Sequence, residues 1–168
     1  MAEKIEFKDK KISRDDLDRI LEAGRLSPTA KSLQPQKIFV VESKKGLDKI
    51  QKLTKYKSPT VLMVCGDIEK CYKDDHAISY IQDCILVSLH MILEATYLGI
   101  DNIYKDYREY KVFDKIEEEF GLNNNIRPVN LIFLGYTTDD SASFKASDFN
   151  CNLLSKRGKT IEEIVEYI

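Results

Sequence analysis

The sequence predicts one α+β domain, because helical and strand-like patterns alternate along 168 residues with no linker between them. Two continuous apolar runs, Thr60–Cys65 and Val129–Gly135, are typical of strands that are buried on both faces. Between them, residues 78–98 are apolar on nearly every side of a helix, so this helix must be buried in a core or against a partner. At this length a single core is the default, and residues 1–168 are expected to form one domain.

The first helix begins after Ser13 and has the clearest start signal in the chain. Ser13 and Asp16 form a capping box, and Ile12 with Leu17 can make a hydrophobic staple at the helix entry. Positions with helical spacing follow: Leu17, Ile20, Leu21 and Gly24. After a short polar loop, the apolar run 38–41 predicts a buried strand.

The pattern continues after the apolar helix, which ends at Gly99, a residue that can supply a left-handed C-terminal cap. Residues 102–104 predict a strand. Apolar residues at helical spacing between 113 and 120 predict another helix, and Gly121 closes it. Helices and strands are therefore expected to keep alternating in this half of the chain.

The last part of the chain differs from the rest in its polarity. Residues 137–159 are mostly polar, show no clear period and are too long for an ordinary connection, so we expect an extended arm that wraps a surface. Thr160 and Glu163 then form a capping box, and the apolar residues that follow predict a final helix as far as Ile168.

The composition excludes several classes of protein. With 26 basic and 28 acidic residues and a net charge of −2, no concentrated basic face for a nucleic acid is readable. The four cysteines lack the paired spacing of a zinc site, no signal peptide is recognisable, and no apolar run is long enough to span a bilayer. We therefore expect a cytoplasmic protein with reduced thiols, no membrane contact and no nucleic-acid partner.

The loop Ser27–Pro35, between the first helix and the first strand, is the most informative segment of the sequence. Its serine, threonine and proline residues lie where backbone amides and hydroxyls are free of regular hydrogen-bond ladders. Free donors favour a polar ligand. Taken alone, however, this loop is better explained as a simple helix stop, since short polar loops are common.

A family resemblance adds to this interpretation. The string from Ile20 to Pro35 resembles the helix and loop of the nitroreductase family, whose usual form is A-P-S-x-x-N-x-Q-P-W. Residues 83–99 resemble the central dimer helix of that family, and residues 127–136 resemble the strand that follows. Lys156-Arg157 resembles its closing basic motif.

The resemblance implies a mostly antiparallel sheet flanked by helices, in an intertwined homodimer whose two subunits share each site for flavin mononucleotide (FMN). It also implies a reaction in which NAD(P)H binds transiently, reduces the flavin at N5 and leaves, after which an electron-poor acceptor takes the electrons. The flavin carries this chemistry, so no catalytic side chain is expected. The residues implied to bind FMN are Lys4, Ser27, Pro28, Thr29, Ser32, Gln34, Lys156 and Arg157.

The chain departs from the family pattern at its N-terminus. Family members usually carry R-R-S-x-R at the positions of residues 1–5, where only Lys4 is basic here. A lysine cannot reproduce the bidentate fork of an arginine. Ser32 and Gln36 also replace the usual Asn and Trp. A non-catalytic, flavin-poor homodimeric binding protein of the same family is therefore the alternative.

Other reactive residues have simpler interpretations. His90 on the apolar helix is expected to be a hydrogen-bonded core or interface residue. Asp74-Asp75-His76 is expected to be a solvated turn and helix cap, with no metal, because adjacent side chains diverge and no third ligand is suitably spaced. Cys84 and Cys151 have no activating neighbour in sequence and are expected to be packing residues.

Overall fold

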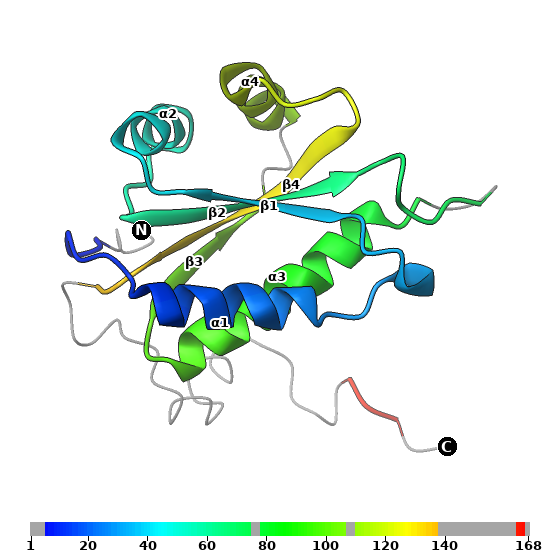
Figure 1. Cartoon of the computed structure of the whole chain (residues 1–168), viewed down its shortest axis with the longest axis horizontal. Coiled ribbons are helices and arrows are strands. Elements are labelled where there is room, and N and C mark those ends of the chain that lie inside the picture. Colours follow the sequence, from blue (N-terminus) through cyan, green and yellow to red (C-terminus); the bar gives the residue numbers. More distant parts are fainter. Residues whose placement is uncertain (1–5, 75–77, 107–109, 138–163, 167–168) are drawn as a thin grey trace.

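A computed structural model describes residues 6–74, 78–106, 110–137 and 164–166 of the chain. Figure 1 shows a twisted sheet between two layers of helices. In chain order the elements are α1 (Arg14–Arg25), the 3-10 turn η1 (Ala30–Ser32), β1 (Gln36–Val41), α2 (Lys44–Thr54), β2 (Thr60–Asp67), α3 (Tyr80–Tyr97), β3 (Asp101–Lys105), α4 (Tyr110–Phe120) and β4 (Ile126–Gly135).

The sheet has the order β1-β2-β4-β3, and every neighbouring pair of strands is antiparallel. The register places Val41 opposite Val61 and Thr60 opposite Leu134, with a bulge between Val64 and Cys65. Helices α1 and α3 cover one face of the sheet, and α2 and α4 cover the other (Figure 1). The α+β class and the antiparallel sheet flanked by helices are thus confirmed.

The two central strands, β2 and β4, separate two hydrophobic clusters. Leu62, Val64 and Ile132 face α1 and α3, whereas Met63 and Phe133 face α2 and α4. All eight residues of β2 and nine of the ten residues of β4 are buried. The sequence-based prediction of two strands buried on both faces is confirmed, and these strands fix the positions of all four helices.

The prediction for β1 was wrong in one respect. The strand exists, but only Val41 is buried along it, and Val40 is 37% exposed. The reason is that β1 lies at the edge of the sheet and pairs only with β2 among the described residues. An apolar run of four residues does not distinguish a central strand from an edge strand.

The predicted helix caps are present. Ser13 Oγ accepts a hydrogen bond from the Asp16 N–H at 3.1 Å and donates one to the Asp16 carboxylate at 2.7 Å. Gly99 has φ +71°, and the Ile100 N–H donates to Ala95 O at 2.9 Å, which is the cap expected after α3. Gly121 closes α4 in the same way with φ +61°.

A close approach of α1 and α3 depends on Gly24. A Cβ atom at Gly24 would lie 2.7 Å from Met91 Cγ. The missing side chain therefore lets the two helices pack tightly, and it sets the position from which the chain leaves α1 and enters the loop that follows.

The last helix is not confirmed by the residues that the structure describes there. Residues 164–166 form a turn followed by irregular chain, and Ile164 and Val165 are 66% and 41% exposed. So short a helix is unstable in water unless an apolar face packs, and these side chains pack poorly. The predicted capping box at Thr160 and Glu163, and the predicted arm beyond Thr137, lie outside the described residues. No described helix is both long and apolar enough to cross a membrane.

Candidate functional site

The predicted ligand loop connects α1 to β1, and we call residues 26–35 the α1–β1 loop. It lies beyond the N-terminal end of α3, at the right-hand end of the view in Figure 1. Ser27 is buried at its start, Thr29 is half-buried, and Ser32 and Gln34 are exposed. The structure thus collects five of the eight predicted FMN-binding residues in one short segment: Ser27, Pro28, Thr29, Ser32 and Gln34.

The backbone of this loop is strained. Lys31, Ser32 and Gln34 have φ values of 48°, 55° and 48°, and only Lys55 shares this feature among the other described non-glycine residues. A left-handed conformation costs a non-glycine residue about 1–3 kcal/mol and persists where its surroundings enforce it. Such strain is often found at functional sites, and it indicates that the shape of this loop is specified.

Hydrogen bonds within and beside the loop enforce its shape. The Gln34 N–H donates to Thr29 Oγ1 at 3.0 Å, and Gln34 Nε2 donates to Arg25 O at 3.1 Å. The Asp67 N–H donates to Pro35 O at 2.8 Å. Gln34 therefore braces the loop across its base.

Two further hydrogen bonds attach the loop to α3. The Ala30 N–H donates to Asp83 Oδ1 at 2.8 Å, and Ser27 Oγ lies 3.0 Å from His90 Nδ1. His90 Nδ1 also lies 2.9 Å from Leu86 O. His90 is thus a hydrogen-bonded, half-buried residue, as the sequence predicted, and its bond to Ser27 gives it a role in placing the loop.

The loop keeps several donors available for a ligand. Among the described residues, the backbone N–H groups of Thr29 and Lys31 have no hydrogen-bond acceptor, and the exposed Ser32 hydroxyl has no partner. Gln36 Oε1, just past the loop, is a buried acceptor with no donor within the same part of the chain. Donors and an acceptor at one end of the sheet suit a flat ligand with polar edges.

We call residues 6–12, before α1, the N-terminal segment. Within one chain, this segment lies far from the loop. Phe7 pairs with Thr137, and the Lys8 N–H donates to Tyr136 O, just after the last residue of β4. The loop instead joins β1 beside Gly66, which pairs with Arg127 near the start of β4. The 10 residues of β4 span about 30 Å at ~3.3 Å per residue. The N-terminal segment and the loop therefore occupy opposite ends of the sheet.

Three predicted site residues are not placed by the structure, because Lys4, Lys156 and Arg157 lie outside the described residues. Their roles remain predictions from the resemblance. The same applies to the missing arginines at residues 1–5.

One side of α3 is an uncovered apolar stripe in the single chain. Cys84, Val87, Met91 and Ala95 are fully buried against the sheet and α1. On the opposite side, the exposed fractions of four residues are 43% for Ile81, 44% for Ile85, 47% for Leu89 and 39% for Leu93. We call these four residues the α3 stripe. The helix that looked apolar all round thus buries one half in its own core and leaves the other half available to a partner.

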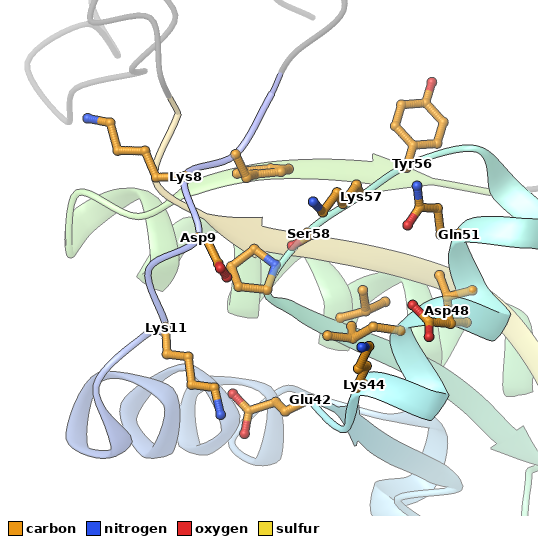
Figure 2. Close-up of a pocket in the computed structure, with 15 residues that line it drawn as sticks. Lys8, Asp9, Lys11, Glu42, Lys44, Asp48, Gln51, Tyr56, Lys57 and Ser58 are labelled. Atoms are coloured by element: carbon orange, nitrogen blue, oxygen red, sulfur yellow. The ribbon is translucent and has the colours of Figure 1, made fainter.

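Two cavities of similar size contain no residue of the α1–β1 loop. The first, of about 530 Å³, is enclosed by the N-terminal segment, α2 and residues 56–61, as Figure 2 shows. Its lysines are interleaved with carboxylates, and the Glu42 carboxylate accepts a hydrogen bond from Thr60 Oγ1 at 2.9 Å. This mixture of charges favours no single class of ligand, and the cavity contains none of the predicted site residues.

The second cavity, of about 500 Å³, has aromatic walls and borders the α3 stripe. Tyr80, Tyr104 and Phe113 line it together with Ile81 and Ile85 of the stripe. Burial, followed by the nearby Asp106 carboxylate, raises the pKa of Tyr104. A partner that covers the α3 stripe would also bound this cavity. Sequence patterns did not reveal it, because its walls come from four separate elements, α3, β3, α4 and β4.

The structure describes three of the four cysteines and the first residue of the turn Asp74-Asp75-His76. Burial raises the pKa of the Cys84 thiol to about 12 and that of Cys65 still further, so both are unreactive packing residues. Cys151, Asp75 and His76 lie outside the described residues. No group of three or more His, Cys, Asp or Glu side chains suited to a metal occurs in the described part of the chain.

The sequence analysis did not single out Asp83 as a functional residue. It lies in the first turn of α3, is 3% exposed and holds the loop through Ala30. An acidic residue in the first turn of a helix is usually explained by the helix dipole. Only the packing of α3 against the loop reveals the second role.

Comparisons with known proteins match the part of the chain that contains this loop. The model of the nitroreductase family matches residues 4–57, which include α1, the loop and β1. A protein of Archaeoglobus fulgidus, named as a candidate NADH dehydrogenase/NAD(P)H nitroreductase, is 27% identical over 148 residues, which cover 84% of each chain.

Solved structures extend the match along the chain. A nitroreductase family protein of Clostridium difficile 630 is 30% identical, with 96% of this chain and 90% of that chain covered and a TM-score of 0.83. An FMN-dependent nitroreductase of Clostridium difficile R20291 is 22% identical, covers 96% and 91% of the two chains with a TM-score of 0.75, and supports the fold. The chain belongs to the nitroreductase family.

Proposed function

We propose that this protein is an NAD(P)H-dependent flavin oxidoreductase that binds FMN and passes electrons to an electron-poor acceptor such as a nitro compound or a quinone. The observation that carries the proposal is the α1–β1 loop, which is strained, held by α3 and supplied with open donors at Thr29, Lys31 and Ser32. The names of the two relatives above, NAD(P)H nitroreductase and FMN-dependent nitroreductase, support the same activity.

The residues of the loop suit FMN because its ring and ribityl chain present carbonyl and hydroxyl groups to neighbouring donors. The amides of Thr29 and Lys31 and the Ser32 hydroxyl would hold those groups. Lys156 and Arg157, with Lys4, would bind the phosphate by charge-assisted hydrogen bonds. When bound, the flavin supplies the redox chemistry, and the side chains bind and orient it.

We further propose that two copies of the chain pair through the α3 stripe and that each FMN site uses both. The stripe provides an apolar surface that a dimer would bury. Within one chain, the loop and the N-terminal segment lie at opposite ends of β4, so they cannot contribute to the same site. Pairing of two copies would remove this obstacle. A second copy can bring its N-terminal segment to the loop of the first.

The alternative, a flavin-poor homodimeric binding protein, follows from residues 1–5, which lack the arginines that the family usually has there. The retained loop geometry opposes it, because an unused loop has no reason to keep three left-handed residues. We place the protein in the cytoplasm, in keeping with the free thiols of Cys65, Cys71 and Cys84.

Titration with FMN tests the proposed function. The purified protein is expected to be yellow or to take up added FMN, and Arg157→Ala is expected to weaken binding about tenfold or more through the loss of one charge-assisted contact. Arg108→Ala is the matched control, because Arg108 lies outside the family's basic motif. Quenching of flavin fluorescence measures both affinities. If the wild-type protein binds no FMN, the flavin-poor alternative is correct; equal affinities of the two variants would remove Arg157 from the site.

A further inference from the structure

Asp83 is the buried centre of a hydrogen-bond network that joins the α1–β1 loop to α3. Its Oδ1 accepts from the Ala30 N–H at 2.8 Å, and its Oδ2 accepts from Ser79 Oγ at 2.7 Å. The carboxylate is 3% exposed and has no ion pair with the described residues. Its position near the N-terminus of α3 places a negative group where the helix dipole favours one.

The network returns to the loop by a second route. Ser79 Oγ also accepts from the Tyr72 N–H at 3.1 Å, and the Lys31 ammonium lies 4.3 Å from the centre of the Tyr72 ring. Lys31 directly follows Ala30, so the loop is held at two adjacent residues, by a buried carboxylate and by a cation–π contact. The inner of these two contacts, at Asp83, is shielded from water.

The contact at Ala30 is placed where it controls the strained part of the loop. Ala30 begins η1, and the left-handed residues Lys31 and Ser32 follow at once. Strained backbone relaxes when its anchors are removed. Fixing the Ala30 N–H therefore restricts the backbone that carries the open Lys31 amide and the exposed Ser32 side chain.

We propose that Asp83 is the positioning residue of the ligand loop: its carboxylate holds Ala30 so that the amide of Lys31 and the hydroxyl of Ser32 are presented in the binding geometry. The proposal rests on the proposed function for the identity of the ligand, FMN, but the anchor itself exists in the free protein. Since Asp83 belongs to α3, the same helix would carry the subunit contact on one side and the loop on another.

Substitution of Asp83 tests the role. Asp83→Ala is expected to lower FMN affinity at least tenfold, because a buried N–H donor loses its acceptor and the loop relaxes. Asp83→Asn is expected to stay within about threefold of the wild type, because an amide oxygen can still accept from Ala30 while Ser79 accepts from the amide nitrogen. Glu42→Ala is the control: it removes a different carboxylate, which is half-buried and accepts one hydrogen bond from Thr60 Oγ1, beyond the far end of β1.

A second variant removes the donor of the same hydrogen bond, the Ala30 N–H. Ala30→Pro removes the N–H donor and fixes φ at residue 30, and Thr29, with φ −134° and ψ 158°, already has the extended conformation that a residue before proline adopts. Ala30→Pro is expected to lose FMN affinity as Asp83→Ala does. If Asp83→Ala fails to fold, this variant and Asp83→Asn carry the test.

Hydrogen exchange separates this proposal from the proposed function. In the free protein, the Ala30 amide is expected to be protected in the wild type, in Asp83→Asn and in Glu42→Ala, and to exchange at least tenfold faster in Asp83→Ala. A wild-type protein that binds no FMN would overturn the proposed function while this measurement still tested the anchor. Wild-type FMN affinity in a folded Asp83→Ala or Ala30→Pro variant, or unchanged protection of Ala30 in Asp83→Ala, would overturn the role of Asp83.

Discussion

Replacing Leu89 with aspartate is expected to convert the proposed dimer into a folded monomer at micromolar concentration. Leu89 is 47% exposed in the single chain and lies in the middle of the α3 stripe, so the substitution leaves the core of the subunit intact. In a symmetric dimer the change occurs twice, and an unpaired buried carboxylate costs at least about 3 kcal/mol each time. The total of about 6 kcal/mol weakens the dimer by roughly four orders of magnitude.

Light scattering after size-exclusion chromatography measures this effect. The control is Val40→Asp, which places the same charge on a 37% exposed apolar residue of the edge strand β1, outside the stripe. The control is expected to remain dimeric. A wild-type monomer, or a Leu89→Asp protein that stays dimeric, would show that α3 is not the subunit contact.

Restoring arginines to the N-terminus is expected to tighten FMN binding about tenfold or more. The variant carries Ala2→Arg and Ile5→Arg behind a short added leader, at two positions where the family usually has arginine. Each guanidinium can contribute a charge-assisted, bidentate contact worth about 1.5–3 kcal/mol to the phosphate or the ring edge. The rate of nicotinamide oxidation with a quinone or nitroaromatic acceptor is expected to rise with occupancy of the site.

The control for this variant adds the same positive charge without the planar guanidinium group. Ala2→Lys with Ile5→Lys adds the same two positive charges but no planar fork, so it is expected to recover only part of the gain. Flavin titration of all three proteins gives the comparison. Unchanged affinity of the arginine variant in a folded dimer would mean that Lys4, Lys156 and Arg157 suffice, and that the N-terminal departure does not limit binding.

Much of the fold could be predicted from the sequence because local signals and global packing agree. Continuous apolar runs identified β2 and β4, since a strand covered by helices on both faces has no polar side. The caps of α1 and α3 were predictable from Ser13 and Gly99, because capping depends on residues within one turn.

The predictions failed for elements whose structure depends on the neighbouring elements rather than on local sequence. The pattern of β1 gave no sign that it lies at the edge of the sheet, which only strand order decides. The final apolar residues have helical spacing, but the described residues 164–166 form a turn and irregular chain in which Ile164 and Val165 are exposed.

The candidate site was likewise predictable only where local sequence determines it. The loop residues were found because Ser27–Pro35 carries a motif, whereas Asp83 was missed because it lies 48 residues after Pro35 in a helix that the sequence explains by packing alone. Its function comes from a long-range hydrogen bond to a backbone N–H, and such a bond leaves no pattern in the sequence. The left-handed conformations of Lys31 and Ser32 are equally unreadable, since neither residue is the glycine that usually marks them.

We propose that each FMN site is built from the loop of one subunit and from Lys4, Lys156 and Arg157 of the other, and mixed dimers test this proposal most directly. One variant, Ser32→Trp, obstructs the open face of the loop; the second, Lys156→Ala with Arg157→Ala, removes the phosphate contacts. Each variant alone is expected to bind FMN weakly. A mixed dimer would combine both defects in one site and leave the other site intact.

The measurement is the number of tight FMN sites after the two variants are unfolded together, refolded and titrated. Random pairing makes about half of the dimers mixed, so about a quarter of all sites should regain wild-type affinity if the sites are shared. The two variants refolded separately and then compared at the same total concentration provide the baseline. Recovery of about a quarter of the sites is the predicted result, and no recovery in dimers shown to be mixed would contradict the account.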